Sequence, residues 1–275
     1  MMLDFLELDA ADLALSGPRL SFQSAGDAGP PVLLMHGIGA NSMGWRHIMA
    51  GLAPHARVFA WNAPGYFLSD PFLSDAPRAE DYADAALDML DVLGVTEPVH
   101  LVGSSFGSML GACFASRHPA RVATLTLFGA SRGQRWKGAE ARAAMLAMRE
   151  DSIRDGGVAL ARTRSAKLVA PDASPEVLAE VRRMVAATDA RGLMQAARCT
   201  DSVDVVFDFA PLIVAPTLVV TGTADAVNPP EVAMAIADAI TGAVLELPEG
   251  LGHLPELENP GFALNLLQRH MNLGS

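Results

Sequence analysis

One serine of this chain stands in a sequence context that suits a nucleophile. Ser105 is the middle residue of Gly-Ser-Ser-Phe-Gly at 103–107, between an apolar run that ends at Val102 and a helical run over 109–117. A GxSxG segment between a strand and a helix places its serine at the tip of a sharp turn, where glycines avoid collision with the neighbouring elements. A hydroxyl is a weak nucleophile near neutral pH, so attack on a carbonyl carbon would need a histidine and an acid beside it.

Suitable partners for Ser105 occur further along the chain. Asp225 lies in Gly-Thr-Ala-Asp-Ala-Val-Asn-Pro at 222–229, and His253 lies in Gly-Leu-Gly-His-Leu-Pro at 250–255. Each segment follows a predicted strand, so both side chains are expected at the same edge of the sheet as Ser105. The order and spacing predict a catalytic triad of Ser105, Asp225 and His253. One alternative stays open for Asp225, which could cap a helix before Pro229.

The remaining histidines fit the role of a base less well. His100 lies inside a strand run, and His36 precedes the nucleophile. The others lie in or beside helical patterns: His47, His55, His118 and His270. We interpret all of them as structural or surface residues. No carboxylate directly follows the strand run that ends at Phe128, which removes the other common position for the acid.

The loop after the first long strand run predicts an oxyanion hole. It reads Met-His-Gly-Ile-Gly at 35–39. Because Gly37 has no side chain, the backbone here can approach a substrate, and the N–H of Ile38 is expected to bind the oxyanion of a tetrahedral intermediate together with the N–H of Phe106. Gly37 is therefore predicted to border the substrate, and the side chains of Ile38 and Phe106 are predicted to be pocket walls.

The same loop does not fit a dinucleotide site, and no cofactor is expected. The third glycine of a GxGxxG fingerprint is missing, and the next strand run ends in Asn62 where an acid would bind a ribose. The two cysteines, Cys113 and Cys199, lie far apart and have no neighbour at metal-ligand spacing. No metal site is expected either.

Charge and hydropathy restrict the partners. The formal net charge of -11 opposes binding to nucleic acid or to an anionic membrane. The first residues carry acids instead of the basic start and apolar run of an export signal, and no uninterrupted apolar run approaches the ~18 residues of a membrane span. We therefore expect a cytoplasmic protein that acts on a small molecule; the oligomeric state is not indicated.

The elements that must position these residues follow from the apolar pattern. Buried parallel strands are predicted at 31–35, 57–61, 99–102, 122–128, 217–221 and 244–247. Helical patterns lie between them, the clearest at 82–93 with a stop at Gly94. This alternation predicts an α/β fold with helices on both faces of a parallel sheet, preceded by a β-hairpin over 3–24.

The alternation breaks in one long segment. Between 131 and 209, Ala, Arg, Met and Glu dominate and no good strand candidate occurs. The chain is accordingly predicted to consist of a core formed by 1–130 and 210–275 and a helical cap formed by 131–209.

Four motifs in this order resemble the α/β-hydrolase superfamily over nearly the whole chain. They are HGxG at His36, GxSxG at Ser105, GxxDxxxP at Asp225 and GxGHxPxxExP at His253. The resemblance implies a mostly parallel eight-stranded sheet flanked by helices, a helical cap inserted after the sixth strand, and the triad assigned above. Within the superfamily the chain is most similar to enol-lactonases and small esterases grouped with carbon–carbon bond hydrolases.

Three positions refine this resemblance. The segment 62–69 is similar to the family's DxxGxGxS turn, but Asn62 replaces the acid and Phe67 replaces the second glycine. Serine at position 105 disfavours dehalogenases and epoxide hydrolases, which use an aspartate nucleophile in this superfamily. Carbon–carbon bond hydrolases often have methionine directly after the nucleophile, whereas Phe106 follows it here, and this favours esters.

The predicted function is hydrolysis of a small carboxylic ester or lactone through an acyl-enzyme on Ser105. Three alternatives stay open: cleavage of a carbon–carbon bond in a ring-fission product, a triad-bearing ligand receptor with little turnover, and perhydrolysis with peroxide in place of water. Trp136 is predicted to bind the substrate, and Met145, Met148 and Met194 are candidates for the walls of an apolar acyl site.

Overall fold

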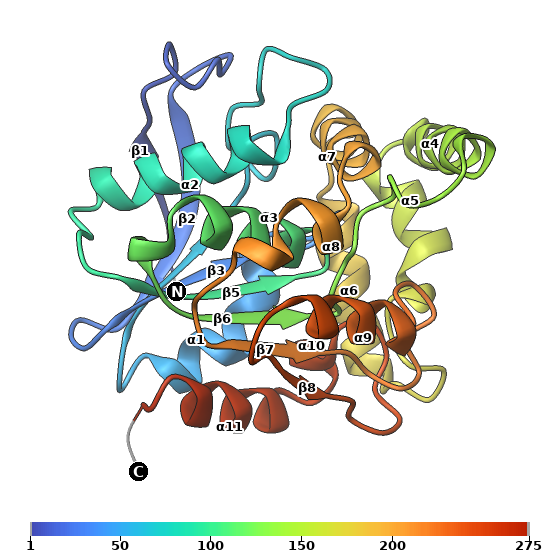
Figure 1. Ribbon diagram of the computed structural model, residues 1–275. Helices are drawn as coiled ribbons and strands as arrows, with labels where there is room; N and C mark the ends of the chain where they lie inside the picture. Colours follow the sequence, from blue (N-terminus) through green and yellow to red (C-terminus); the bar gives the residue numbers. More distant parts are fainter. Residues whose placement is uncertain (1, 274–275) are drawn as a thin grey trace.

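A single sheet of eight strands organises the protein in the computed structural model, which describes residues 2–273 (Figure 1). The strand order is β1-β2-β4-β3-β5-β6-β7-β8. The strands are β1 (Leu3–Glu7), β2 (Arg19–Ala25), β3 (Pro31–Met35), β4 (Arg57–Trp61), β5 (Val99–Ser104), β6 (Val122–Phe128), β7 (Thr217–Val220) and β8 (Val244–Glu246). β1 and β2 form the predicted hairpin, β2 runs antiparallel to β4, and the strands from β4 to β8 are parallel.

Helices cover both faces of the sheet, as the alternating pattern predicts. α1 (Arg46–Leu52) and α11 (Pro260–His270) pack on one face, whereas α2 (Ala79–Val92), α3 (Phe106–Arg117) and α9 (Pro230–Ala239) pack on the other (Figure 1). The central strands are therefore apolar on both sides. In β3, Val32 and Leu34 enter the core beneath α1 and α11, while Leu33 and Met35 enter the opposite core.

The edge strand β8 differs from the prediction of a buried strand. Its residues are half-buried or exposed, and the side chain of Val244 is 53% exposed. β8 pairs only with β7, so one side of the strand has no neighbour in the sheet. The apolar run at 244–247 predicted a strand correctly but did not indicate its place at the edge.

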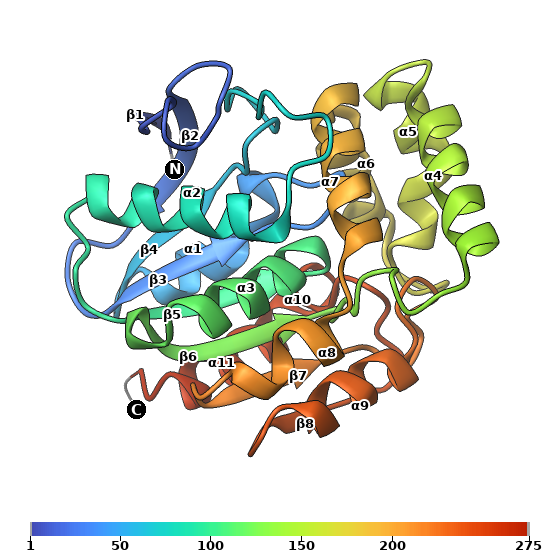
Figure 2. The ribbon, with the colours of Figure 1, turned by 45° about the horizontal axis from the view of Figure 1, so that its top comes forward.

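Four long helices lie between β6 and β7, over the carboxyl ends of the parallel strands (Figure 2). They are α4 (Ala139–Ile153), α5 (Gly157–Arg164), α6 (Pro175–Ala186) and α7 (Ala190–Ser202), and we call them the cap. The sheet, the flanking helices and this insertion after the sixth strand confirm the predicted fold class. A short helix, α8 (Val205–Asp208), also falls within 131–209 but packs against α3 and α9 of the body. The division into domains at 131 and 209 stays a prediction.

Local signals explain where several of these elements end. α2 stops just before Gly94, whose φ of +69° is the left-handed conformation that closes a helix at glycine. α6 begins at Pro175 after Ser174, whose side chain accepts a hydrogen bond from the N–H of Val177. Between residues 2 and 273, none of the helices combines the length and the apolar character that crossing a bilayer requires.

Candidate active site

Ser105 lies at the sharp turn between β5 and α3, in a strained backbone conformation. Its φ is +53° and its ψ is -112°, values that a residue with a side chain rarely adopts. The flanking glycines have no room for a side chain: a Cβ on Gly103 would lie 2.2 Å from the carbonyl oxygen of Gly107, and one on Gly107 would lie 2.1 Å from that of Met35. The GxSxG spacing is thus a steric requirement of this turn.

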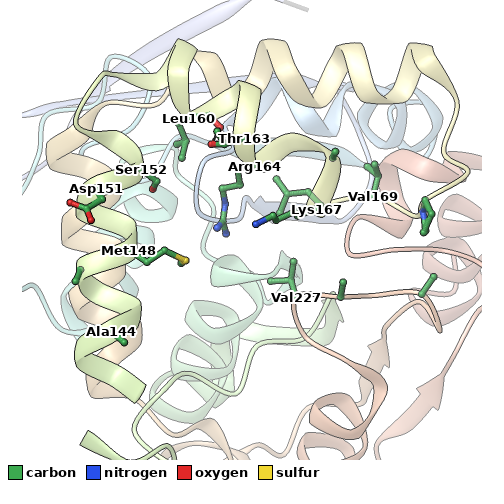
Figure 3. A pocket seen from close by; sticks show the side chains of 16 residues that line it. Ala144, Met148, Asp151, Ser152, Leu160, Thr163, Arg164, Lys167, Val169 and Val227 are labelled. Carbon is green, nitrogen blue, oxygen red and sulfur yellow. Dashed lines mark hydrogen bonds between the residues drawn. The ribbon is translucent and has the colours of Figure 1, made fainter. Parts of the chain in front are cut away.

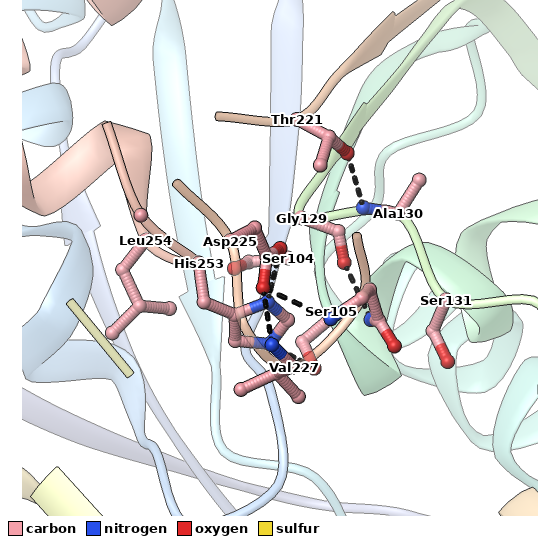
Figure 4. A network of polar contacts seen from close by, with 12 residues as sticks. Ser104, Ser105, Gly129, Ala130, Ser131, Thr221, Asp225, Val227, His253 and Leu254 are labelled. Atoms are coloured by element: carbon pink, nitrogen blue, oxygen red, sulfur yellow. Dashed lines mark hydrogen bonds and ion pairs between the residues drawn. The ribbon is translucent and has the colours of Figure 1, made fainter. Parts of the chain in front are cut away.

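A chain of hydrogen bonds joins Ser105 to the two residues that the motifs predicted (Figure 4). Nε2 of His253 lies 2.9 Å from Oγ of Ser105, and Nδ1 of His253 lies 2.7 Å from Oδ2 of Asp225. A carboxylate only accepts, so Nδ1 donates to Asp225 and Nε2 is left to accept the hydroxyl proton of Ser105. His253 and Asp225 are 2% and 4% exposed, which shields the hydrogen bond between them from water.

The second oxygen of Asp225 fixes the carboxylate in its loop. Oδ1 accepts hydrogen bonds from the N–H groups of Val227 and Asn228, over 2.7 and 2.9 Å. The alternative role as a helix cap does not fit, because α9 begins at Pro230 and its N-terminal cap position is Pro229. Asp225 therefore has one oxygen free to orient His253.

His36 serves the structure of the loop that carries Gly37. Its Nε2 accepts a hydrogen bond from the N–H of Ala63 over 3.0 Å, and its Nδ1 donates to the carbonyl oxygen of Gly37 over 2.9 Å. Burial lowers the pKa of His36 to about 4, so the ring stays neutral near pH 7. Both ring nitrogens are engaged away from Ser105, in agreement with a structural role.

Two backbone N–H groups and the predicted glycine meet beside Ser105. Ile38, Phe106 and Ser105 line the same cavity, and a Cβ on Gly37 would lie only 3.0 Å from the Cβ of Ser105. Phe106 begins α3, where the first N–H groups have no partner within the helix. Within residues 2–273, neither the N–H of Ile38 nor that of Phe106 donates to another protein group. Their role as an oxyanion hole stays a prediction.

Comparison with known proteins identifies the family. Residues 30–260 match the family model described as the alpha/beta hydrolase fold. The chain belongs to the α/β-hydrolase family. It is 33% identical to 2-hydroxy-6-oxononadienedioate/2-hydroxy-6-oxononatrienedioate hydrolase 2 of Pseudomonas putida over 119 residues, which cover 42% of this chain and 41% of that relative.

Solved structures show the same fold over nearly the whole chain. A thermophilic esterase from Thermogutta terrifontis is 24% identical with a TM-score of 0.85, and the likeness covers 98% of each chain. The enol-lactonase from Burkholderia xenovorans LB400 is 23% identical with a TM-score of 0.84, over 98% of this chain and 100% of that one. The α/β-hydrolase architecture described above is therefore the one these proteins adopt.

The cavity that contains Ser105 is small and opens toward a larger groove in this α/β-hydrolase. The cavity has a volume of about 130 Å³, and the groove, between the cap and the loop after β7, has a volume of about 940 Å³. Both are lined by Met148, Arg164 and Val227, and Figure 3 shows these three side chains directed into the groove. The groove therefore adjoins the cavity of Ser105.

The cavity lining includes some of the cap residues that were predicted to bind the substrate and lacks others. Trp136 does not line the cavity: it is 45% exposed, its indole N–H donates to the carbonyl oxygen of Gly133 over 3.1 Å, and the guanidinium of Arg132 lies over its ring. Met145 and Met148 line the cavity, whereas Met194 does not. Trp136 precedes α4 and lies at the surface beside the guanidinium of Arg132.

Cationic residues of the cavity were missed by the sequence reasoning. Lys137, Arg149 and Arg164 line it alongside Ser105. The cavity thus combines apolar walls with positive charge, and the predicted apolar acyl group stays a prediction. The only signal in the sequence was the number of arginines in the cap, which does not say which of them turn inward.

Glu256 is a second residue that the motifs did not single out. It is 3% exposed, and its Oε1 accepts a hydrogen bond from Oγ of Ser104 over 2.6 Å. Burial raises the pKa of Glu256 to about 7. Glu256 follows His253 by three residues, so its hydrogen bond with Ser104 connects the segment after His253 to the end of β5.

The broken DxxGxGxS turn keeps its shape without the family residues. Oδ1 of Asn62 accepts from the N–H of Ser42 over 2.7 Å, and its Nδ2 donates to Oγ of Ser21 over 2.9 Å, so the amide uses both of its ends. Phe67 adopts a φ of +35°, the left-handed region that the family's glycine would favour.

Over residues 2–273, no three His, Cys, Asp or Glu side chains gather as metal ligands would.

Proposed function

We propose that this protein is a serine hydrolase that cleaves a small carboxylic ester or lactone through an acyl-enzyme on Ser105. The observation that carries the proposal is the hydrogen-bonded sequence from Ser105 through His253 to Asp225, which ends in a cavity where two backbone N–H groups are free. Nucleophile, base, orienting acid and oxyanion donors are the parts that acyl transfer requires.

The proposed reaction proceeds in two halves. In the first, Oγ of Ser105 attacks the carbonyl carbon, Nε2 of His253 takes the hydroxyl proton, and the N–H groups of Ile38 and Phe106 stabilise the oxyanion. The tetrahedral intermediate then expels the alcohol, which leaves with the proton from His253. In the second half, His253 deprotonates a water that attacks the acyl-enzyme, and the carboxylic acid departs as Ser105 regains its proton. Asp225 stabilises the imidazolium of His253, which forms once in each half of the reaction.

Turnover of p-nitrophenyl butyrate tests the proposal. Ser105→Ala is expected to reduce nitrophenolate release to the background rate and to abolish labelling by a fluorophosphonate probe, because no other hydroxyl is hydrogen-bonded to His253 within the described residues. Ser116→Ala is the matched control: this serine lies in α3, the helix that begins directly after Ser105, and its hydroxyl donates to the carbonyl oxygen of Cys113. Unchanged hydrolysis by Ser105→Ala would refute the assignment.

A second candidate is hydrolysis of a carbon–carbon bond. It is favoured by the relatives, since the P. putida protein that matches 42% of this chain is named as a hydrolase of 2-hydroxy-6-oxononadienedioate. The match spans less than half of that relative, and Phe106 follows the nucleophile where methionine is frequent in such enzymes. Steady-state rates on p-nitrophenyl butyrate and on a 2-hydroxy-6-oxo-dienoate separate the two: a kcat/KM higher for the dienoate would replace the ester proposal.

A further inference from the structure

Three cationic side chains surround the cavity of Ser105, and the proposed chemistry uses none of them. Lys137 lies just before α4, Arg149 is in α4 and Arg164 is in α5. Arg164 also lines the outer groove, and Figure 3 shows its guanidinium pointing into that space. No acidic side chain lines the cavity. The walls next to the nucleophile therefore carry positive charge on the cap side.

These arginines differ from their neighbours because they have no acidic partner. Arg142 and Arg154, which flank Arg149 in sequence, pair with Asp201 and Asp151 respectively. Among residues 2–273, no Asp or Glu lies within ion-pair distance of Arg149 or Arg164. Nη1 of Arg149 and Nε of Arg164 are buried and have no hydrogen-bond partner at all. The two guanidiniums thus hold unused donors beside the site.

This arrangement of two arginines destabilises the folded protein when no anion is bound. Burial and the nearby charge of Arg164 lower the pKa of Arg149 to about 10, and burial likewise lowers that of Arg164. Both groups remain cations near pH 7. Two like charges that line one cavity and have no acidic partner among residues 2–273 raise the free energy of the folded state, and an anion that binds between them would lower it.

We propose that the substrate is an anionic ester or lactone whose acyl portion carries a carboxylate, bound by Arg149 and Arg164. This inference rests on the proposed function. The planar guanidinium forks suit the two oxygens of a carboxylate. The cavity of about 130 Å³ is much smaller than the neighbouring groove, which favours a short acyl chain, such as a succinyl group, beside Ser105. The leaving group occupies the groove of about 940 Å³.

A matched pair of esters tests this substrate class. p-Nitrophenyl hemisuccinate and the p-nitrophenyl ester of monomethyl succinate differ in one charge, and nitrophenolate release reads both, with the Ser105→Ala rate subtracted as background. The wild type should show a kcat/KM about 10- to 100-fold higher for the hemisuccinate, as expected for hydrogen bonds to a charged group. Equal values for the two esters would overturn the proposal, while Ser105-dependent turnover would leave the hydrolase assignment standing.

Variants of the two arginines test whether these residues cause the preference for the charged ester. Arg149→Met and Arg164→Met should each reduce the ratio of the two kcat/KM values by about tenfold or more. Arg162→Met is the control, since Arg162 is an exposed residue of the same helix as Arg164 and should retain the wild-type ratio. Because each buried guanidinium lacks a partner, its replacement by methionine should not lower the midpoint of thermal unfolding, whereas a purely structural arginine would. A ratio unchanged in both inner variants would refute the role of the arginines.

A binding measurement covers the case in which neither ester is hydrolysed. Calorimetric titration of Ser105→Ala with succinate should give a saturable heat that Arg149→Met removes and Arg162→Met keeps. Absence of that heat in Ser105→Ala, or its persistence in the Arg149→Met background, would contradict the carboxylate site independently of catalysis.

Discussion

Replacing Glu256 with glutamine tests whether the buried carboxyl of this residue keeps its proton in the folded protein. Oε1 of Glu256 accepts a hydrogen bond from Ser104, and Oε2 has no partner among the described residues. Burial raises the pKa of Glu256 from 4.5 to about 7. His36 borders the same small cavity, but its pKa of about 4 keeps it neutral above pH 5, so no cation offsets a carboxylate there.

The sign of the effect follows from proton binding. The unfolded chain loses this proton near pH 4.5, whereas the folded protein keeps it until about pH 7. The free energy of unfolding therefore falls as the pH rises from 4.5 to 7 and stays low above that range. At 1.36 kcal/mol per pH unit, the interval from 4.5 to about 7 corresponds to a loss of about 3 kcal/mol. In Glu256→Gln the amide is neutral at every pH, and its carbonyl oxygen can still accept from Ser104.

Urea denaturation of both proteins at pH 5 and pH 8 measures the effect. Other groups titrate alike in the two proteins, so the informative quantity is the difference between their free energies of unfolding. Part of the loss has already occurred at pH 5, so this difference should shift in favour of Glu256→Gln by about 2.5 kcal/mol between the two pH values. Glu249→Gln, which removes an exposed carboxylate after β8, is the control and should show no such shift. A difference for Glu256→Gln that is the same at both pH values would refute the reasoning.

Three further predictions concern the site and its turn. Asp225→Asn should lower kcat for an ester by about three to four orders of magnitude with the fold intact, because an amide cannot orient the imidazole in the same tautomer; circular dichroism checks the fold. Gly37→Ala places a Cβ 3.0 Å from that of Ser105 and should lower kcat by about 10- to 100-fold, as measured by steady-state kinetics. Gly107→Ala places a Cβ 2.1 Å from a backbone oxygen and should cost about 3 kcal/mol or more in urea denaturation, whereas Gly111→Ala in the same helix, with 3.4 Å to its nearest side-chain atom, should be neutral or slightly stabilising.

The sequence predicted the central strands well because of where they lie. β3 and β6 are buried on both faces of the sheet, so nearly every position is apolar and the run has clear ends. The predicted ranges 31–35 and 122–128 coincide with these strands. β8 is similar in composition, but its exposure depends on having β7 as its single neighbour, and that is a property of the sheet order. Local composition carries no information on strand order.

The motif residues converge for a similar reason. Ser105 follows β5, and the loops with Asp225 and His253 follow β7 and β8, all of which are parallel, so their carboxyl ends share one edge. Topology alone thus brings three distant residues to within hydrogen-bond distance. No spacing rule connects the segment of Trp136 to the sheet, and its role in substrate binding stays a prediction.

The arginines of the cap show why the substrate class is harder to infer than the reaction class. Arg142, Arg149 and Arg164 belong to the same kind of sequence, a helix rich in Ala and Arg. What separates them is the partner: Arg142 is neutralised by Asp201, which is 59 residues away in sequence and lies on α7, whereas Arg149 and Arg164 have no acidic partner among residues 2–273. Pairing across helices depends on how α4, α5 and α7 pack, so the sequence of one helix does not show which of its arginines stay unpaired. The residues that perform the proposed chemistry are held by rigid strand ends and have recognisable motifs, but the groups that select the substrate are defined by what the cap leaves unpaired.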